Sequence, residues 1–440
     1  MMQTDRQGLS LNNANAEAAK HFADAIDDFN RYAGDPVSKV DAAIEAAPDF
    51  AMAHLFKAHM YATATEPGAT KEAASILKHV STLSLDEREA SHAAAAAHVV
   101  AGDWTKAALQ LDRHSMDWPH DALALQTGHL IDFFRANARD LRDRISRTLP
   151  QWPEDMHGRS FLLGMHAFGL EESGDYEAAE ASGREAIAQN PADAWAHHAV
   201  AHVMEMQGRA EDGIGWMIAR EPHWADDGNF FQVHNWWHRA LFHLDLEQNA
   251  EALKLYDDHV RGEPSTIAVD LVDAAALLWR FDLQRIDTGS RWTEVADAWK
   301  EHADGALYPF NDLHAAMAYL GADRMNDVDD LLADYRSNAT DVSEVGRWWH
   351  TYGLPLIEGF VAFKKGDYAA AVELLHPARY IVNAYGGSHA QRDVIDWTLM
   401  EAALRGNMQG TAEALAHERL TQKPLSPVNR SFIARAQLIG

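Results

Sequence analysis

The chain has 440 residues, with 38 Lys and Arg against 66 Asp and Glu, and it contains no cysteine. The resulting charge of −28 opposes nucleic acid and anionic membranes as partners, so we expect neither. The lack of cysteine excludes disulfides, thiolate metal sites and a cysteine nucleophile. No N-terminal signal core and no run of about 18 apolar residues is found, so we expect a soluble, cytoplasmic protein.

The polar residues 1–15 are expected to form a flexible N-terminus, and residues 16–440 a single domain. Apolar spacing from Glu17 onward is helical almost throughout. The segment 164–191 has small residues at helix-crossing positions, a Gly174-Asp-Tyr turn, two alanines and a closing Pro191. This is the helix-turn-helix pattern of a tetratricopeptide repeat, and weaker copies occur at 99–111, 238–259 and 360–375. The sequence therefore predicts an all-α fold, an α-solenoid of tetratricopeptide-like hairpins curved around a central groove.

Two segments each carry a pair of histidines four residues apart, His198 with His202 and His234 with His238. On a helix this spacing places both imidazoles on one face, and Glu205 lies on the same stripe as His202. If the segments are neighbouring helices, the four imidazoles converge, and with a carboxylate they suit Zn²⁺, Mn²⁺ or Fe²⁺. Three interpretations stay open: a bound metal, a metal-free functional pocket, and histidines that only fill the core.

Asp270 and Asp273 lie in the strongly apolar segment 268–280. Buried carboxylates are costly unless they are paired, and Arg280 lies two turns after Asp273 on the same side of the helix. We therefore expect a structural ion pair between Asp273 and Arg280. The functional alternative is that one aspartate orients a histidine or acts as a general base.

The segment 386–393 reads Gly-Gly-Ser-His-Ala-Gln-Arg-Asp. The glycines allow a tight turn, and Ser388 is expected to cap the helix that follows. A helix N-terminus beside Arg392 suits a substrate carboxylate or phosphate. Alternatively, the segment is only a capped turn in which Arg392 pairs with Asp393 or another acid.

Several of these segments resemble the tetratricopeptide repeat protein 38 family. The resemblance rests on 196–217, 233–260, 265–280 and 386–393, with Asp-Glu-Arg-Glu-Ala-Ser-His at 86–92 and Asp-Ala-Leu-Ala-Leu at 121–125. It spans the chain from about residue 20 to 420. It implies a soluble, all-helical repeat protein, and it brings no reaction and no residue roles.

The sequence thus predicts a small-molecule-binding α-solenoid with a His/Asp/Glu-rich pocket on its concave face, acting as a hydrolase or another acid–base enzyme. The expected catalytic residues are His198, His202, Glu205, His234, His238 and Asp273. The expected substrate-binding residues are Asn235, Trp237, Asp270, Arg280, His389, Gln391 and Arg392. The expected metal ligands are His198, His202, His234 and His238. The expected partner is a small-molecule ligand or a short peptide, and a homodimer is allowed. The alternative is a tetratricopeptide scaffold that binds a peptide or protein without catalysis.

Overall fold

The structure is a computed structural model that describes residues 2–226, 228–337, 341–381 and 385–439. Its contacts divide the chain into two compact units, where the sequence predicts a single domain. The first unit comprises Met1–Val200 with His223–Phe231, and the second comprises Ala201–Pro222 with Gln232–Gly440. The boundary falls inside one continuous helix, α11 (Ala194–Gln207).

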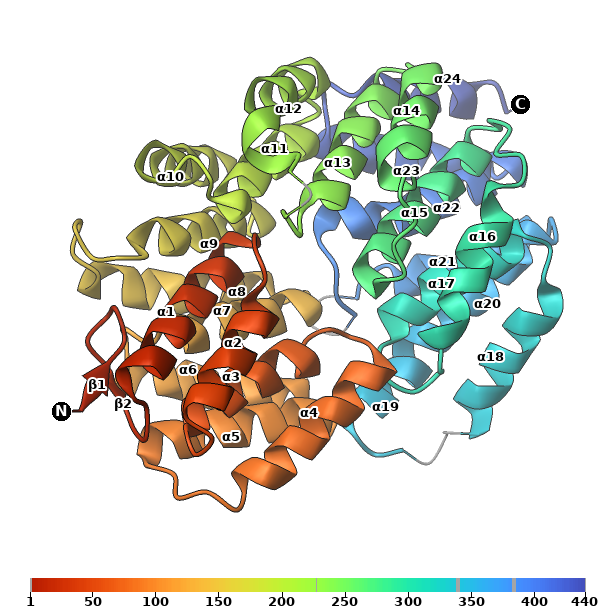
Figure 1. The fold of residues 1–440 in the computed structure, drawn as a ribbon. Helices are drawn as coiled ribbons and strands as arrows, with labels where there is room; N and C mark the ends of the chain where they lie inside the picture. Colours follow the sequence, from red (N-terminus) through yellow and green to blue (C-terminus); the bar gives the residue numbers. More distant parts are fainter. Residues whose placement is uncertain (1, 227, 338–340, 382–384, 440) are drawn as a thin grey trace. The chain divides into compact units, whose positions relative to one another are not determined.

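The first unit is a series of helices joined by short turns, preceded by a small β-hairpin (Figure 1). Its elements are β1 (Gln3–Thr4), β2 (Ser10–Leu11), α1 (Ala16–Arg31), α2 (Pro36–Ala46), α3 (Ala51–Ala62), α4 (Pro67–Val80), α5 (Glu87–Val100), α6 (Trp104–Asp117), α7 (Ala122–Phe134), α8 (Ala138–Thr148), the 3₁₀ turn η1 (Leu149–Gln151), α9 (Arg159–Glu172), α10 (Tyr176–Gln189) and the start of α11.

The second unit continues the same pattern of paired helices. After the end of α11 its elements are α12 (Ala210–Trp224), α13 (Gln232–Asp245), α14 (Asn249–Leu255), η2 (Tyr256–Val260), α15 (Ala268–Leu283), α16 (Arg291–Ala298), η3 (Trp299–Glu301), α17 (Pro309–Gly321), α18 (Met325–Ser337), α19 (Glu344–Trp348), η4 (Trp349–Gly353), α20 (Leu354–Lys364), α21 (Tyr368–Ala378), α22 (His389–Arg405), α23 (Gln409–Gln422) and α24 (Pro427–Gln437).

The predicted all-α solenoid of tetratricopeptide-like hairpins is confirmed. The turn glycines identified in the sequence, Gly102, Gly174 and Gly366, have φ values of +74°, +80° and +79° and each ends the first helix of a pair. The left-handed region is open to glycine without steric cost, which explains its use there. Close helix packing also needs small residues: a Cβ on Gly183 would lie 2.6 Å from the Val200 side chain.

The N-terminus differs from the flexible segment predicted from its polarity. β1 and β2 pair antiparallel, and Leu11 is buried in the core of the first unit. The Asp5 carboxylate accepts hydrogen bonds from the backbone N–H groups of Gln7 and Leu9, which closes the turn between the strands. Its other oxygen lies 3.6 Å from the buried Arg88 guanidinium. A buried charge partner inside the helices therefore orders a segment whose own composition is hydrophilic.

In the second unit, α15 is buried along almost its whole length and packs against α13, α17 and α22. Helix α13 also buries most of its residues, including several that are polar. The polar side chains of α13 and α15 therefore lie in the interior of this unit. No helix among the described residues combines the length and the apolar character that crossing a membrane requires.

Candidate functional site

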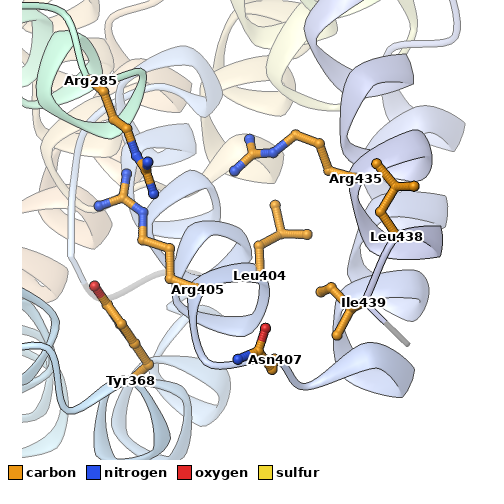
Figure 2. Close-up of a pocket in the computed structure, with 8 residues that line it drawn as sticks. All are labelled: Arg285, Tyr368, Leu404, Arg405, Asn407, Arg435, Leu438 and Ile439. Carbon is orange, nitrogen blue, oxygen red and sulfur yellow. The ribbon is translucent and has the colours of Figure 1, made fainter.

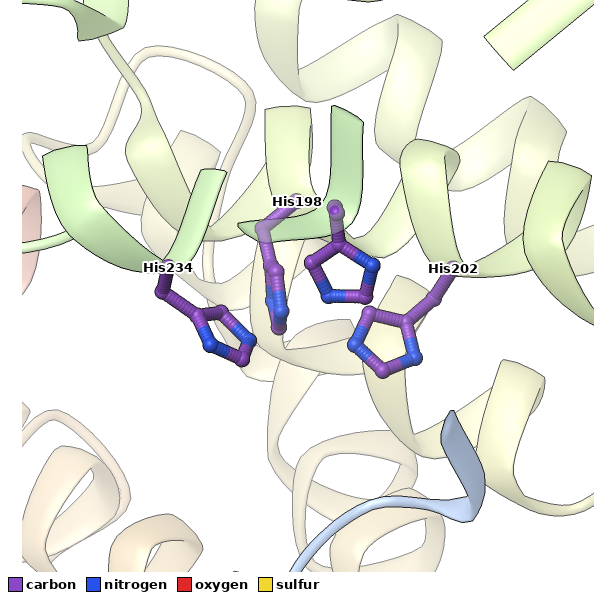
Figure 3. Close-up of side chains that lie close together, drawn as sticks. His198, His202 and His234 are labelled. Atoms are coloured by element: carbon purple, nitrogen blue, oxygen red, sulfur yellow. The ribbon is translucent and has the colours of Figure 1, made fainter. Parts of the chain in front are cut away.

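The second unit brings three histidines together from two helices, His202 on α11 and His234 and His238 on α13. We call them the histidine cluster. The ring centroids of His202 and His238 are 4.4 Å apart, and those of His234 and His238 are 4.7 Å apart. One ligand atom of each residue lies within 4.8 Å of those of the others. Figure 3 shows the rings of His202 and His234. His198, the fourth expected ligand, precedes His202 by one turn on α11 and belongs to the first unit.

Burial controls the charge of His202. His202 and His238 are fully buried, and the His234 side chain is 16% exposed. Burial, reinforced by the neighbouring His238 and His234, lowers the pKa of His202 well below its usual value. His202 is therefore a neutral imidazole at neutral pH, which is the form that binds a metal ion.

Asp273 on α15 orients the cluster. Its carboxylate accepts a hydrogen bond of 2.7 Å from Nδ1 of His234. Because an ionised carboxylate only accepts hydrogen bonds, His234 Nδ1 carries a proton, which leaves Nε2 as its candidate ligand atom. The expected ion pair between Asp273 and Arg280 is not formed among the described residues. Arg280 instead donates to the backbone carbonyls of Ala276 and Ala390, at 3.1 and 2.8 Å.

Trp237 and Arg280 support His234 from its other side. The Trp237 ring stacks on the His234 ring, with centroids 5.2 Å apart and planes 17° from parallel. The buried Arg280 guanidinium lies over the Trp237 ring at 5.5 Å. Arg280 is almost completely buried and already bonded to two carbonyls. We therefore interpret Trp237 and Arg280 as groups that fix the position of His234, and not as the substrate-binding residues expected from the sequence.

Asn235 and Asp270 lie close to these groups in sequence. Asn235 is fully buried next to His234, and its side-chain amide has no hydrogen-bond partner among the described residues. Asp270 is one turn before Asp273 on α15, and burial raises its pKa to about 6. Asp270 is hydrogen-bonded to Ser265, so of these two residues only the Asn235 amide lacks a partner, in the described part of the chain, that explains its burial.

Glu205, expected beside the histidines, is engaged elsewhere. Its carboxylate accepts a hydrogen bond of 2.7 Å from the buried Lys423. This pair belongs to a small cavity of about 20 Å³ in the second unit. The cavity is also lined by the charged residues Asp245, Arg280, Asp393 and Arg419. A space of this size holds about one water molecule, so it is too small for a substrate. The charged side chains that line it therefore neutralise one another.

The Gly386–Asp393 segment is a capped turn. Ser388 caps α22 and forms a capping box with Gln391, as the sequence predicts for the cap. Arg392 donates to the backbone carbonyls of Gly386 and Gly387, and Asp393 forms an ion pair of 2.8 Å with Arg419. His389 is the first residue of α22 and contributes to the electrostatic environment of His202. The side chains of Gln391 and Arg392, expected to bind substrate, therefore bond to their own turn.

A second cluster lies in the first unit and was not predicted. We call it the Asp121 cluster. One carboxylate oxygen of Asp121 accepts hydrogen bonds from Arg88 at 2.6 Å, His92 at 3.0 Å and His114 at 3.2 Å. His59 extends the chain by bonding to His92 at 3.1 Å. Burial alone would raise the pKa of the Asp121 carboxyl. Arg88 and the two imidazoles outweigh it and hold this pKa well below its usual range.

The sequence did contain a signal for the Asp121 cluster. Arg88 and His92 lie in the 86–92 segment and Asp121 begins the 121–125 segment, both of which carry the family resemblance. The structure joins these two segments through buried hydrogen bonds, 29 to 33 residues apart in sequence. Histidine spacing does not mark this cluster, because its residues come from separate segments of the chain.

No known protein-family model matches the chain. Among solved structures, it is similar to the Cut9–Hcn1 hetero-tetramer of the APC/C at 13% identity, covering 95% of this chain and 76% of the other with a TM-score of 0.47. It is similar to human IFIT1 bound to m7Gppp-AAAA at 14% identity, 94% coverage of both chains and a TM-score of 0.43. Yeast Tom70 matches at 13% identity, 96% and 87% coverage and a TM-score of 0.35. At these scores the similarities carry no argument about what this protein binds.

Proposed function

We propose that the second unit binds a divalent transition metal, zinc in the first instance, through His202, His234 and His238, and uses it to hydrolyse a small molecule. The observation that carries the proposal is the hydrogen bond of 2.7 Å from His234 Nδ1 to Asp273. Metal-binding histidines commonly donate their second ring N–H to a carboxylate, which fixes the tautomer and makes the ligand more basic.

The spacing of the cluster supports this proposal. Zinc–nitrogen bonds of about 2.0–2.1 Å place the nitrogens of a tetrahedral site roughly 3.4 Å apart. The candidate atoms all lie within 4.8 Å of one another, somewhat farther apart than in such a site. Imidazoles beside a carboxylate match the ligand preference of zinc, Mn²⁺ and Fe²⁺.

The number of ligands decides what such a site does. Three histidines leave one tetrahedral position for a water, whose pKa a bound metal lowers, as in hydrolytic sites. A fourth protein ligand would instead make a closed, structural site. We favour the open arrangement. The uncommitted Asn235 amide next to His234 is a suitable group for positioning a substrate carbonyl or hydroxyl.

Metal content tests the proposal directly. Wild-type protein is expected to hold about one zinc per chain by elemental analysis, and zinc is expected to raise the unfolding temperature of chelator-treated protein. His238→Gln is expected to lose both effects. The matched control is His243→Gln on the same helix, whose imidazole bonds to Gln248 outside the cluster.

A variant that fails to fold is separated from a lost ligand by circular dichroism and by cobalt substitution. Cobalt in the wild-type site is expected to give the visible absorption bands of tetrahedral coordination. Wild-type protein that takes up neither zinc nor cobalt would contradict the proposal and favour a scaffold that binds peptides. The cobalt bands also separate the open from the closed site, because an added anion shifts them only where a coordination position is open.

Three further points remain proposals. The relationship to the tetratricopeptide repeat protein 38 family rests on the motif segments, two of which converge on the Asp121 cluster. The cytoplasmic location rests on the composition of the chain, and the homodimer is open to measurement by light scattering. None of these three points affects the chemistry proposed for the histidine cluster.

A further inference from the structure

A second site of different chemistry lies in the second unit, away from the histidine cluster in sequence. It is an open pocket of about 460 Å³ between the ends of α15, α22 and α24. We call it the arginine pocket. Its lining residues are Arg285, Tyr368, Leu404, Arg405, Asn407, Arg435, Leu438 and Ile439. Figure 2 shows the guanidinium groups of the three arginines directed toward the same space.

Two of the arginines share one buried carboxylate. Glu401, whose side chain is 2% exposed, accepts hydrogen bonds from Arg405 Nε at 3.0 Å and from Arg435 at 2.5 and 3.0 Å. Arg405 also donates to the backbone carbonyl of Leu283 at 2.7 Å. Glu401 therefore holds the two guanidinium groups in fixed positions.

The third arginine has no such role. Arg285 is exposed in the turn after α15, and its guanidinium makes no hydrogen bond to the described residues. Arginines at helix C-termini often neutralise the last carbonyls of the helix, and this explains Arg405. It does not explain Arg285, because its guanidinium contacts no such carbonyl in the described part of the chain.

The charge of the pocket is unusual for this molecule. Its lining holds three arginines and no acidic residue, on a chain whose net charge is −28. Guanidinium groups bind phosphate through paired N–H donors. Leu404, Leu438 and the Tyr368 ring add an apolar wall. The volume falls within the range of about 300–1,000 Å³ that is typical of small-molecule sites.

We propose that the arginine pocket binds the phosphate group of a small phosphate monoester, with Arg285 as the main contact and the apolar wall against its organic group. A lining with three arginines and no acidic residue matches a phosphate dianion better than a monovalent carboxylate. Tyr368 and Asn407 supply further polar groups at the rim. The proposal is independent of the metal site, since the two sites share no residue.

The test is a calorimetric titration of the full-length protein with inorganic phosphate, phenyl phosphate and benzoate at constant ionic strength. We expect saturable binding of both phosphates, tighter for phenyl phosphate because of the apolar wall, and much weaker binding of benzoate. Arg285→Gln is expected to weaken phenyl phosphate binding about 10- to 100-fold, the usual effect of losing a charged hydrogen-bonding group. Arg285→Lys should recover only part of it.

Arg324→Gln is the matched control, because Arg324 is a surface arginine of the same unit bonded to Asp297. It should leave phosphate binding unchanged. Equal binding by Arg285→Gln, a benzoate affinity equal to that of phenyl phosphate, or a signal that sodium chloride reproduces would each overturn the proposal. Arg285 makes no hydrogen bond within the described residues, so its replacement leaves the fold intact.

Discussion

Each unit buries a group of histidines beside an aspartate, but the aspartate occupies a different place in each. In the first unit, Asp121 lies at the centre and accepts hydrogen bonds from Arg88, His92 and His114 on the same oxygen. In the second unit, Asp273 lies at the edge and bonds to His234 alone among the three histidines. The central carboxylate, Asp121, is already paired with the Arg88 cation. Asp273 lies beside its histidines, so the imidazoles surround the centre of that cluster.

This difference separates a structural cluster from a candidate metal site. Candidate atoms of His92, His114 and Asp121 also lie within 4.8 Å of one another. Their Nε2 atoms, however, must carry protons in order to donate to Asp121, so no imidazole lone pair faces the centre. A metal there would have to displace Arg88, which is itself buried and would lose its partner. Histidine proximity alone is therefore a poor criterion for a metal site.

The largest expected effect comes from removing the central charge. Asp121→Asn leaves Arg88 buried without its main counter-charge, and we expect it to destabilise the first unit by about 3–5 kcal/mol. Hydrogen exchange of peptides from α5 to α7 measures this loss. The control is Asp41→Asn, which removes a partly exposed ion pair with Lys57 and should cost at most about 1 kcal/mol. Equal effects would show that Asp121 does not organise its cluster.

A second prediction uses pH. Burial lowers the pKa of His92 from 6.5 to about 4. Between pH 6.5 and 4 the His92 imidazole is protonated in the unfolded chain but stays neutral in the folded protein. The free energy of unfolding therefore falls as the pH drops from 6.5 to 4. The 2.5 units correspond to about 3 kcal/mol at 1.36 kcal/mol per unit. His92→Gln should remove most of this slope in hydrogen exchange of α5, whereas His417→Gln, at an exposed position, should keep it.

The fold was largely predictable from the sequence, because its signals are local. Gly102, Gly174 and Gly366 mark turns through their backbone freedom, and alanines permit close helix contact. The convergence of His234 and His238 follows from helical spacing as well. The partner of Asp273 could not be predicted, because Arg280 on its own helix and His234 on α13 are equally reasonable partners until helix packing is known.

The Asp121 cluster illustrates the same limit. His59, His92 and His114 lie on three different helices, so no i, i+4 spacing marks them. The N-terminal hairpin was missed for a related reason, because the stabilising contact of Asp5 is Arg88, far along the chain. Contacts within one hairpin can be inferred from periodicity, but contacts between hairpins require the register in which the helices stack.

The third prediction tests whether Asp273 acts through His234. Asp273→Asn keeps the shape of the side chain but weakens the carboxylate–histidine bond, and we expect zinc affinity to fall about 10- to 100-fold. Competition with a chromophoric chelator measures it. Asp270→Asn, one turn earlier on α15, is the matched control and should have a smaller effect, since it leaves the His234 bond intact. If both variants bind zinc as wild type does, Asp273 has only a structural role.

The smallest expected effect concerns the Gly386–Asp393 turn. The question is whether its polar groups only bond to one another, as in the Asp121 cluster, or contribute to binding, as proposed for the histidine cluster. Ser388 and Gln391 satisfy the first N–H groups of α22, and Arg392 bonds to carbonyls of its own turn. A turn closed in this way should respond to Ser388→Ala with the loss of a helix cap, about 1 kcal/mol. Its zinc and phosphate affinities should not change. A large loss of zinc affinity with little loss of stability would instead place this turn in the metal site, beside His202.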